Sequence, residues 1–299
     1  MTRATLLAAA LLALSAASSP AFTADSADPP VPAAVFTDPP IDPAHPPRMD
    51  VLHIPSGGVQ INGVIYLAAG AGPHPTVILL HGLPGNEKMQ DLAQAIRRAG
   101  WNCIAFNYRG SWGSPGAFSL EGNIVDAKAL LSFVRDPANV AAFQIDTRKL
   151  VLAGHSMGGW VTALTAAQDP GLAGAVLISA ADMAGHGATP AVRPRVVKSM
   201  ESEMESLAGT SREKLADEII GASPRLSFNA AVAKGLTDKP QLILTSNDGL
   251  APDAEGLASK IQGDGGTRVS VHHEATDHAW SGIRIALEAT VIRWLQGLT

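Results

Sequence analysis

The feature that most constrains this chain is the pentapeptide GHSMG at residues 154–158. It follows the apolar run 150–153 and precedes a helical pattern over 159–167. A strand, a tight turn and a helix in this order place the serine on a turn so sharp that the residues two before and two after it must be small. Glycine meets this requirement because it has no Cβ. The pattern predicts that Ser156 presents its hydroxyl at the end of a sheet, as a nucleophile would.

Strand and helix patterns alternate along the chain, which predicts an α/β fold with a mostly parallel sheet and helices on both faces. The first two strands flank a Ser-Gly-Gly turn and predict an antiparallel hairpin. Continuous apolar runs such as 76–80 are typical of central parallel strands. We expect strands at 51–54, 59–67, 76–80, 101–106, 150–153, 173–179, 241–244 and 268–272, and helices at 87–99, 123–135, 159–167, 253–261 and 283–295.

Residues 181–236 interrupt this alternation. The segment predicts one helix over 196–207 and a second that ends near Ile220, preceded by a capping box over 210–213. An insertion at this point is a candidate lid over a functional site. A surface elaboration without a role is the alternative.

The N-terminal 21 residues have the pattern of a secretory signal peptide, with Arg3, an apolar stretch over 5–17 and small residues at 19–21. The apolar stretch is shorter than the roughly 20 residues of a membrane span, so we expect cleavage rather than an uncleaved anchor. The pattern predicts export to the periplasm or the medium. Residues 22–48 are proline-rich and predict an extended linker, either a tether or an arm on the domain. A catalytic domain is expected over 49–299.

Composition excludes several classes of site. The formal net charge of −5 argues against nucleic acid or an anionic membrane surface as a partner. A single cysteine, Cys103, excludes an internal disulfide and a cysteine-based metal site, and its place in an expected strand predicts a buried, inert thiol. We find no metal-binding histidine motif and no phosphate-binding loop, and therefore expect neither a metal nor a cofactor.

A serine hydroxyl needs a neighbouring base, and the base needs an orienting acid. Because the carboxyl ends of parallel strands share one crevice, the candidates are residues just beyond strand ends. Asp248 follows one expected strand and His278 follows the next. The order Ser156, Asp248, His278 is the one expected when the serine lies on such a turn. We predict that these three residues form a catalytic triad.

Other residues compete for two of these roles. Asp253 is the alternative acid, although we expect it to lie in or cap the next helix. His272 and His273 are alternative bases, but at the end of a strand their side chains would point across the sheet. Asp277 is adjacent to His278 and is expected to stabilise the loop.

The same mechanism needs two N–H donors for the developing oxyanion. Met157, directly after the serine, supplies one from the start of its helix. Gly82 lets the backbone approach closely, so the N–H of Leu83 is the expected second donor. We expect the side chains of Met157 and Leu83 to flank a partly apolar pocket, and His81 to be buried beneath the loop.

The chain resembles the α/β-hydrolase superfamily, within the group of small serine esterases, dienelactone-hydrolase-like and peptidase-like members. The resemblance covers roughly residues 50–299. It is carried by His81-Gly82, Asn107-Tyr108-Arg109-Gly110, the 154–158 pentapeptide, Asp248 and Asp277-His278.

This resemblance implies the α/β-hydrolase fold, an eight-stranded mostly parallel sheet with a small helical insertion after the sixth strand. It also implies Ser156 as nucleophile, His278 as base and Asp248 as acid. The usual pattern at the acid is glycine-x-x-aspartate. In this chain Ser246 stands two residues before Asp248, where many relatives have a different small residue.

Together these features predict an exported serine hydrolase that cleaves small carboxylic esters through an acyl-enzyme. A peptidase or amide hydrolase that acts on short peptides would use the same residues and stays open. A non-catalytic binding protein on this fold is the alternative from another class.

Overall fold

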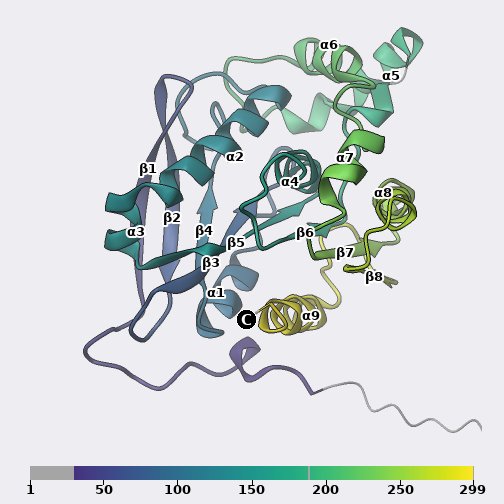
Figure 1. Cartoon of the computed structure of the whole chain (residues 1–299). Coiled ribbons are helices and arrows are strands. Elements are labelled where there is room, and N and C mark those ends of the chain that lie inside the picture. Colours follow the sequence, from purple (N-terminus) through teal and green to yellow (C-terminus); the bar gives the residue numbers. More distant parts are fainter. Residues whose placement is uncertain (1–29, 188, 299) are drawn as a thin grey trace, which may run out of the picture. The chain divides into compact units, whose positions relative to one another are not determined.

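The structure is a computed structural model that describes residues 30–187 and 189–298, and these residues contain an eight-stranded sheet with helices on both faces (Figure 1). The strand order is β1-β2-β4-β3-β5-β6-β7-β8. β2 runs antiparallel to β1 and to β4, and the other neighbours are parallel. The predicted fold class is confirmed. The strands are β1 (Arg48–Ser56), β2 (Val59–Leu67), β3 (His74–Leu80), β4 (Asn102–Phe106), β5 (Ile145–His155), β6 (Gly174–Ile178), β7 (Gln241–Ser246) and β8 (Val269–Glu274).

Helices cover the two faces of the sheet unequally. One face packs against α1 (Gln90–Arg98) and α9 (Arg284–Gln296). The other packs mainly against α2 (Leu120–Arg135), α4 (Met157–Ala166) and α8 (Ala251–Gly263). The central strands therefore lie between two apolar cores, which explains their unbroken hydrophobic runs.

Local capping explains where some helix boundaries differ from the prediction. α1 begins at Gln90 rather than near residue 87, because the Glu87 carboxylate accepts a hydrogen bond from the Met89 N–H at 2.5 Å and Met89 has a left-handed φ of 54°. α2 begins earlier than predicted, because Ser119 Oγ caps it by accepting from the Gly122 N–H at 3.0 Å. The prediction missed α3 (Pro137–Phe143), which Asp136 caps.

The insertion lies between β6 and β7, after the sixth strand as predicted. The single helix expected over 196–207 is wrong. The helix α5 covers Arg193–Ser199 and ends at Ser199, whose hydroxyl donates to the Val196 carbonyl at 2.8 Å and competes with the helical backbone. The cap of α6 is Ser211, within the predicted capping box. The insertion consists of η2 (Gly185–Gly187), η3 (Pro190–Val192), α5 (Arg193–Ser199), η4 (Glu201–Glu203), α6 (Arg212–Ala222) and α7 (Ala230–Leu236).

The single cysteine lies in β4, between β2 and β3 in the sheet. Cys103 is fully buried, and this burial raises the pKa of its thiol far above the usual value. The expectation of a buried thiol is confirmed.

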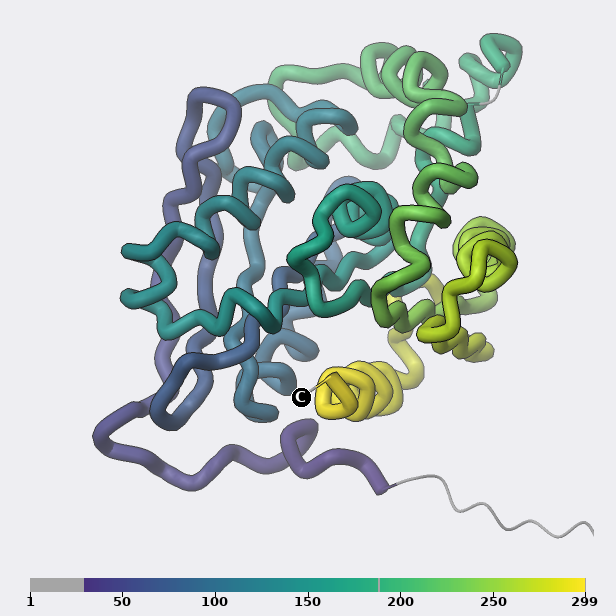
Figure 2. Tube along the Cα trace, in the orientation of Figure 1, coloured from purple at the N-terminus to yellow at the C-terminus, as the bar shows by residue number. Residues whose placement is uncertain are grey.

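The predicted signal peptide lies outside the described residues. Part of the proline-rich linker is described, and its short helix η1 (Ala33–Val35) packs against α1 and α9 (Figure 2). Arg98 fixes it by donating to the carbonyls of Ala34 and Val35, at 2.6 and 2.9 Å. This part of the linker is thus an arm that lies on the domain.

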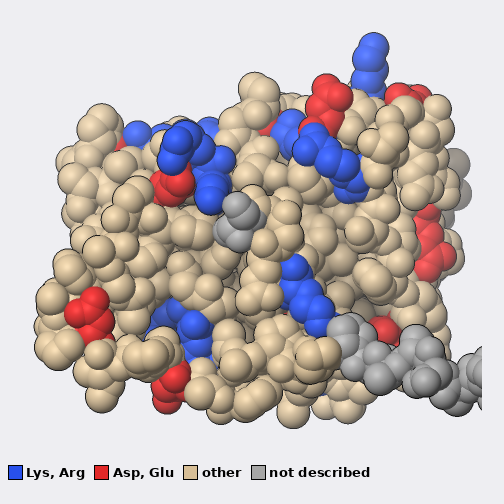
Figure 3. Space-filling view, turned by 60° about the horizontal axis from the view of Figure 1, so that its bottom comes forward, with Lys and Arg blue, Asp and Glu red and all other residues tan. Residues whose placement is uncertain are grey.

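Acidic and basic side chains are interspersed on the face shown in Figure 3. In the described part of the chain, no helix combines the length and the apolar character needed to cross a membrane.

Candidate active site

Ser156 occupies the sharp turn between β5 and α4. Its φ of 57° and ψ of −122° are strained for a residue with a side chain, as is common at functional sites. A Cβ on Gly154 would lie 2.0 Å from the Gly158 carbonyl oxygen, and a Cβ on Gly158 would lie 2.0 Å from the Leu80 carbonyl oxygen. Any other residue would therefore displace the backbone. The prediction that both positions must be small is confirmed, and the structure admits only glycine at each.

Ser156 and His278 line the same cleft, which has a volume of about 360 Å³. Its walls come from the loop after β3, the turn after β5, the loop after β8 and the insertion. The lining residues are Gly82, Leu83, Pro84, Gly85, Asn86, Glu87, His155, Ser156, Glu203, Asp277, His278 and Ala279.

Asp248 lies next to His278, as the sequence predicts. The distance from His278 Nδ1 to Asp248 Oδ2 is 2.7 Å, and the Asp248 side chain is 4% exposed against 39% for His278. Burial opposes the ionisation of Asp248, but hydrogen bonds from His278, from the Leu250 N–H and from Ser246 outweigh it and lower the pKa of this carboxyl. Because Nδ1 is engaged by a carboxylate, Nε2 is the nitrogen available to take a proton.

The competing residues have other partners. Asp253 lies in the first turn of α8, where its carboxylate contacts His186 Nε2 at 3.0 Å. His272 and His273 lie within β8, and His273 Nδ1 is 2.9 Å from Thr245 Oγ1. In this structure the carboxylate that contacts His278 is that of Asp248.

The two predicted oxyanion donors belong to backbone close to the serine: Met157 follows it directly, and a Cβ on Gly82, before Leu83, would lie 3.0 Å from Ser156 Cβ. His81 is buried, as expected, and its Nδ1 lies 2.7 Å from the Gly82 carbonyl oxygen. Burial lowers the pKa of His81 to about 4, so the ring is neutral and Nδ1–H donates. A trans peptide points its N–H away from its carbonyl, so the Leu83 N–H points away from His81. The Met157 N–H is in the first turn of α4, where it has no partner within the helix.

The expectation for the Met157 side chain is wrong. Leu83 lines the cleft, but Met157 is fully buried, and its sulfur accepts a hydrogen bond from Asn123 Nδ2 at 3.4 Å. All residues of α4 are buried, and the Met157 side chain at its start points to α2, the helix that carries Asn123. The apolar lining of the cleft comes from Leu83 and Pro84 in the loop after β3 and from Ala279 in the loop after β8.

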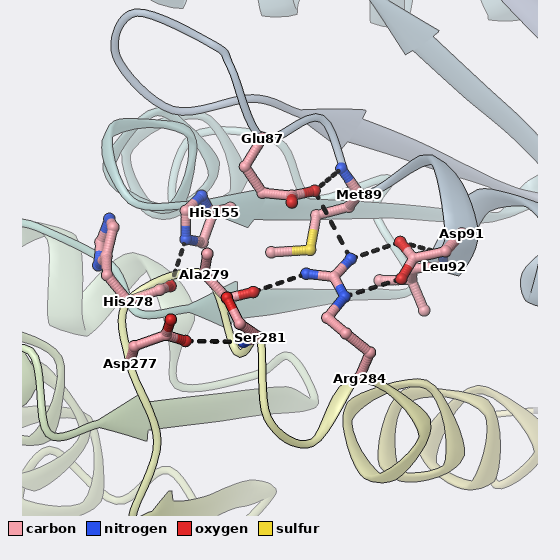
Figure 4. Close-up of polar contacts among 10 residues, drawn as sticks. All are labelled: Glu87, Met89, Asp91, Leu92, His155, Asp277, His278, Ala279, Ser281 and Arg284. Atoms are coloured by element: carbon pink, nitrogen blue, oxygen red, sulfur yellow. Dashed lines mark hydrogen bonds and ion pairs between the residues drawn. The ribbon is translucent and has the colours of Figure 1, made fainter.

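His155 fixes the backbone of His278, the predicted base (Figure 4). Its Nε2 lies 2.8 Å from the His278 carbonyl oxygen, and the two imidazole rings are 4.6 Å apart. Burial, and then the proximity of His278, lower the pKa of His155 to about 4, so a neutral ring donates this hydrogen bond. The sequence prediction gave His155 no role, although it lies inside the diagnostic pentapeptide.

Arg284 fixes the next residue of the same loop (Figure 4). Its Nη1 donates to the Ala279 carbonyl at 2.8 Å, while its Nε donates to Asp91 in α1 at 2.7 Å. The Asp277 carboxylate accepts from the Ser281 N–H at 2.7 Å, which confirms that Asp277 stabilises the loop. Sequence alone gave no signal for Arg284, because its partner Asp91 is distant along the chain.

A second cleft of about 540 Å³ adjoins the first and shares Pro84 and Asn86 with it. Trp112 lines this second cleft and donates its Nε1–H to the Pro84 carbonyl at 2.7 Å. The insertion contributes Glu203 to the first cleft and residues 202 and 205–208 to the second. The insertion thus forms part of both walls. Across the described residues, no group of three or more His, Cys, Asp or Glu side chains is placed to bind a metal ion.

Comparison with known proteins identifies the family. The model of the alpha/beta hydrolase family matches residues 77–282, and the chain belongs to this family. An uncharacterized protein of Mycobacterium tuberculosis is 29% identical over 126 residues, which cover 42% of this chain and 43% of that protein. The quorum-quenching protein AidA of Acinetobacter baumannii is 27% identical over 175 residues, 56% of this chain and 53% of AidA. The chain spans about half the length of these curated relatives.

Solved structures agree on the fold. An esterase of Pyrobaculum calidifontis superposes with a TM-score of 0.63 at 17% identity, over 85% of this chain and 87% of the esterase.

Proposed function

We propose that the protein is an exported serine hydrolase that cleaves small carboxylic esters. One observation carries the proposal: Ser156 and His278 line one cleft, and Asp248 lies 2.7 Å from the imidazole on its other side. Membership of the alpha/beta hydrolase family and the likeness to an esterase in fold support it.

In the proposed mechanism Ser156 Oγ attacks the ester carbonyl while His278 Nε2 takes the serine proton. Asp248 keeps the proton of His278 on Nδ1 and stabilises the imidazolium. The N–H groups of Leu83 and Met157 bind the oxyanion. His278 then protonates the leaving alcohol, and a water molecule activated by the same imidazole releases the acid.

The decisive experiment compares purified wild type with Ser156→Ala on p-nitrophenyl esters of graded chain length. We expect the variant to fold normally and to lose roughly 10³–10⁶ in kcat. Ser132→Ala is a matched control, because Ser132 is an exposed serine of α2. Wild-type rates in Ser156→Ala would refute the assignment.

The same assay separates the alternatives. Aminoacyl anilides cleaved faster than esters would make the protein a peptidase or amide hydrolase with the same triad. A fluorophosphonate probe that fails to label Ser156 would favour a binding protein. Export is tested by mass spectrometry of the periplasmic fraction and the medium, where the mature chain should lack about the first 21 residues.

A further inference from the structure

Trp280 lies two residues after the predicted base, and its side chain is buried. Its Nε1–H donates to the hydroxyl oxygen of Ser179 at 3.0 Å. An indole N–H is a donor only, so Ser179 Oγ must accept in this contact. Ser179 directly follows β6 and is also buried.

The contact continues from Ser179 to the acid. Ser179 Oγ lies 2.8 Å from Ser246 Oγ, at the end of β7, and the Ser246 side chain is buried as well. Ser246 stands two residues before Asp248, and its hydroxyl contributes to the lowered pKa of that carboxyl. An ionised carboxylate is an acceptor only.

The two ends of this series determine its direction. Each hydroxyl has a single hydrogen to donate. A hydroxyl stabilises an ionised carboxylate only as a donor, so we assign the Ser246 hydrogen to Asp248. Ser179 then donates to Ser246, and it can do so because it accepts from Trp280. All the donors therefore point from the loop of the base toward the acid.

We propose that Trp280, Ser179 and Ser246 form a hydrogen-bond relay that positions Asp248 against His278. This inference rests on the proposed function, because it assumes that the Asp248–His278 pair is catalytic. The relay joins the loop after β8 to the ends of β6 and β7, so the base and the acid are fixed relative to each other. Its members are positioning residues, which act on the reacting groups through Asp248.

Backbone geometry supports a functional relay. Ser179 and Trp280 have φ angles of 43° and 60°, which are unfavourable for residues with a Cβ. Such conformations persist where the surroundings determine them, and they cluster at functional sites. A glycine would adopt these φ angles without strain, but it would lack the side chain that forms the hydrogen bond between Trp280 and Ser179.

The test uses Trp280→Phe, which removes the N–H and keeps an aromatic ring, and Ser246→Ala, which removes the donor to Asp248. We expect each to lower kcat about tenfold and to change KM less than twofold. The acid limb of the pH profile of kcat/KM should move to higher pH by roughly half a unit. The Asp248 carboxylate loses a hydrogen-bond donor, so the protonated form of the Asp248–His278 pair becomes more favourable. Two titratable groups face Asp248, namely His278 and His155, and both remain in the two variants.

Trp160→Phe is the matched control. Trp160 is buried to the same degree, and its Nε1–H donates to the Leu226 carbonyl at 2.6 Å, outside the relay. This variant should lose thermal stability without moving the acid limb. The double variant Trp280→Phe/Ser246→Ala should be no slower than the worse single variant, because the relay is already broken.

A wild-type acid limb and kcat in Ser246→Ala would overturn the relay, as would an equal shift in Trp160→Phe. Ser246→Ala carries the test even where Trp280→Phe does not fold, and thermal melts identify that case. Ser156→Ala is measured in parallel. Full activity in Ser156→Ala refutes the proposed function, whereas an inactive Ser156→Ala with an unchanged Ser246→Ala refutes the relay alone.

Discussion

The turn that carries Ser156 and the loop that carries His278 face the same cleft, but different forces fix them. The turn is specified by close backbone contacts, in which Gly154 and Gly158 leave no room for a Cβ. The loop is specified by side chains from elsewhere in the fold. His155 donates to the backbone carbonyl of His278, and Arg284 donates to that of Ala279.

This difference determines how each region responds to change. A backbone contact at 2.0 Å from an added Cβ cannot be relieved by rotating a side chain, so the turn either forms or does not. A loop fixed by several hydrogen bonds loses them one at a time, and each is worth only about 0.5–1.5 kcal/mol, or more when a charged group takes part. We therefore expect all-or-none effects in the turn and graded effects in the loop.

The largest effect is expected from Gly158→Ala. Its Cβ would meet the Leu80 carbonyl oxygen, so the turn would have to move and Ser156 with it. Ester hydrolysis should fall to the level of Ser156→Ala, and the free energy of unfolding should fall by about 3 kcal/mol or more. Urea titration and the ester assay measure both quantities. A variant with more than a tenth of wild-type activity would contradict the all-or-none description.

An intermediate effect is expected from His155→Gln on the pH dependence of the free energy of unfolding. His155 belongs to the turn and fixes the loop. Its folded pKa is about 4 against 6.5 for a free histidine, so between these values the unfolded state binds a proton that the folded state does not. Its contribution therefore decreases as pH falls from 6.5 to 4. Wild type should lose about 2–3 kcal/mol more than His155→Gln between pH 7 and 4.5.

Urea titrations of both proteins at the two pH values measure this difference. Burial of His81 acts in the same direction as burial of His155. Glu288 acts in the opposite direction, because burial, and then the proximity of Asp91, raise its pKa to about 7 and its contribution is lost as pH rises from 4.5 to 7. Both groups are present in both proteins and cancel in the comparison. Identical pH dependence in the two proteins would show that His155 is not buried in its neutral form.

The smallest effect is expected from Arg284→Met, which keeps the aliphatic stem and removes the donor to Ala279. We expect kcat to fall about three- to tenfold with little change in KM, because His278, the proposed base, is less well positioned. Arg193→Met is the control: Arg193 pairs with Asp217 at 2.6 Å on the exposed surface of the insertion, and such pairs contribute about 0–1 kcal/mol. Equal effects on kcat in the two variants would show that Arg284 does not position His278.

The same contrast explains how much the sequence could predict. The turn is a local feature whose two glycines lie only four residues apart, so the pentapeptide at 154–158 predicts it. The contact between Asp248 and His278 was predictable from strand order, because both follow neighbouring strands at one edge of the sheet.

The remaining interactions depend on packing between distant segments. Arg284 contacts Asp91, and Trp280 contacts Ser179, and no periodicity or spacing connects these pairs. The insertion and the helix that Ser211 caps were predicted correctly, but the helix expected over 196–207 was not, because α5 already ends at Ser199. Met157 was misplaced for a related reason: which side of a fully buried helix faces the cleft is decided by its neighbours.

The single thiol in β4 can be used to measure transient local opening of the fold. Cys103 is enclosed by strands on both sides and by a core that includes Trp101. Its reactivity is suppressed both by lack of access and by a raised pKa. A thiol reagent can therefore modify it only during openings that expose the core between the sheet and α1. The labelling rate measures how often those openings occur, and no probe has to be introduced. A variant that loosens the core around β4 should be labelled faster, whereas one that loosens only the loop after β8 should not.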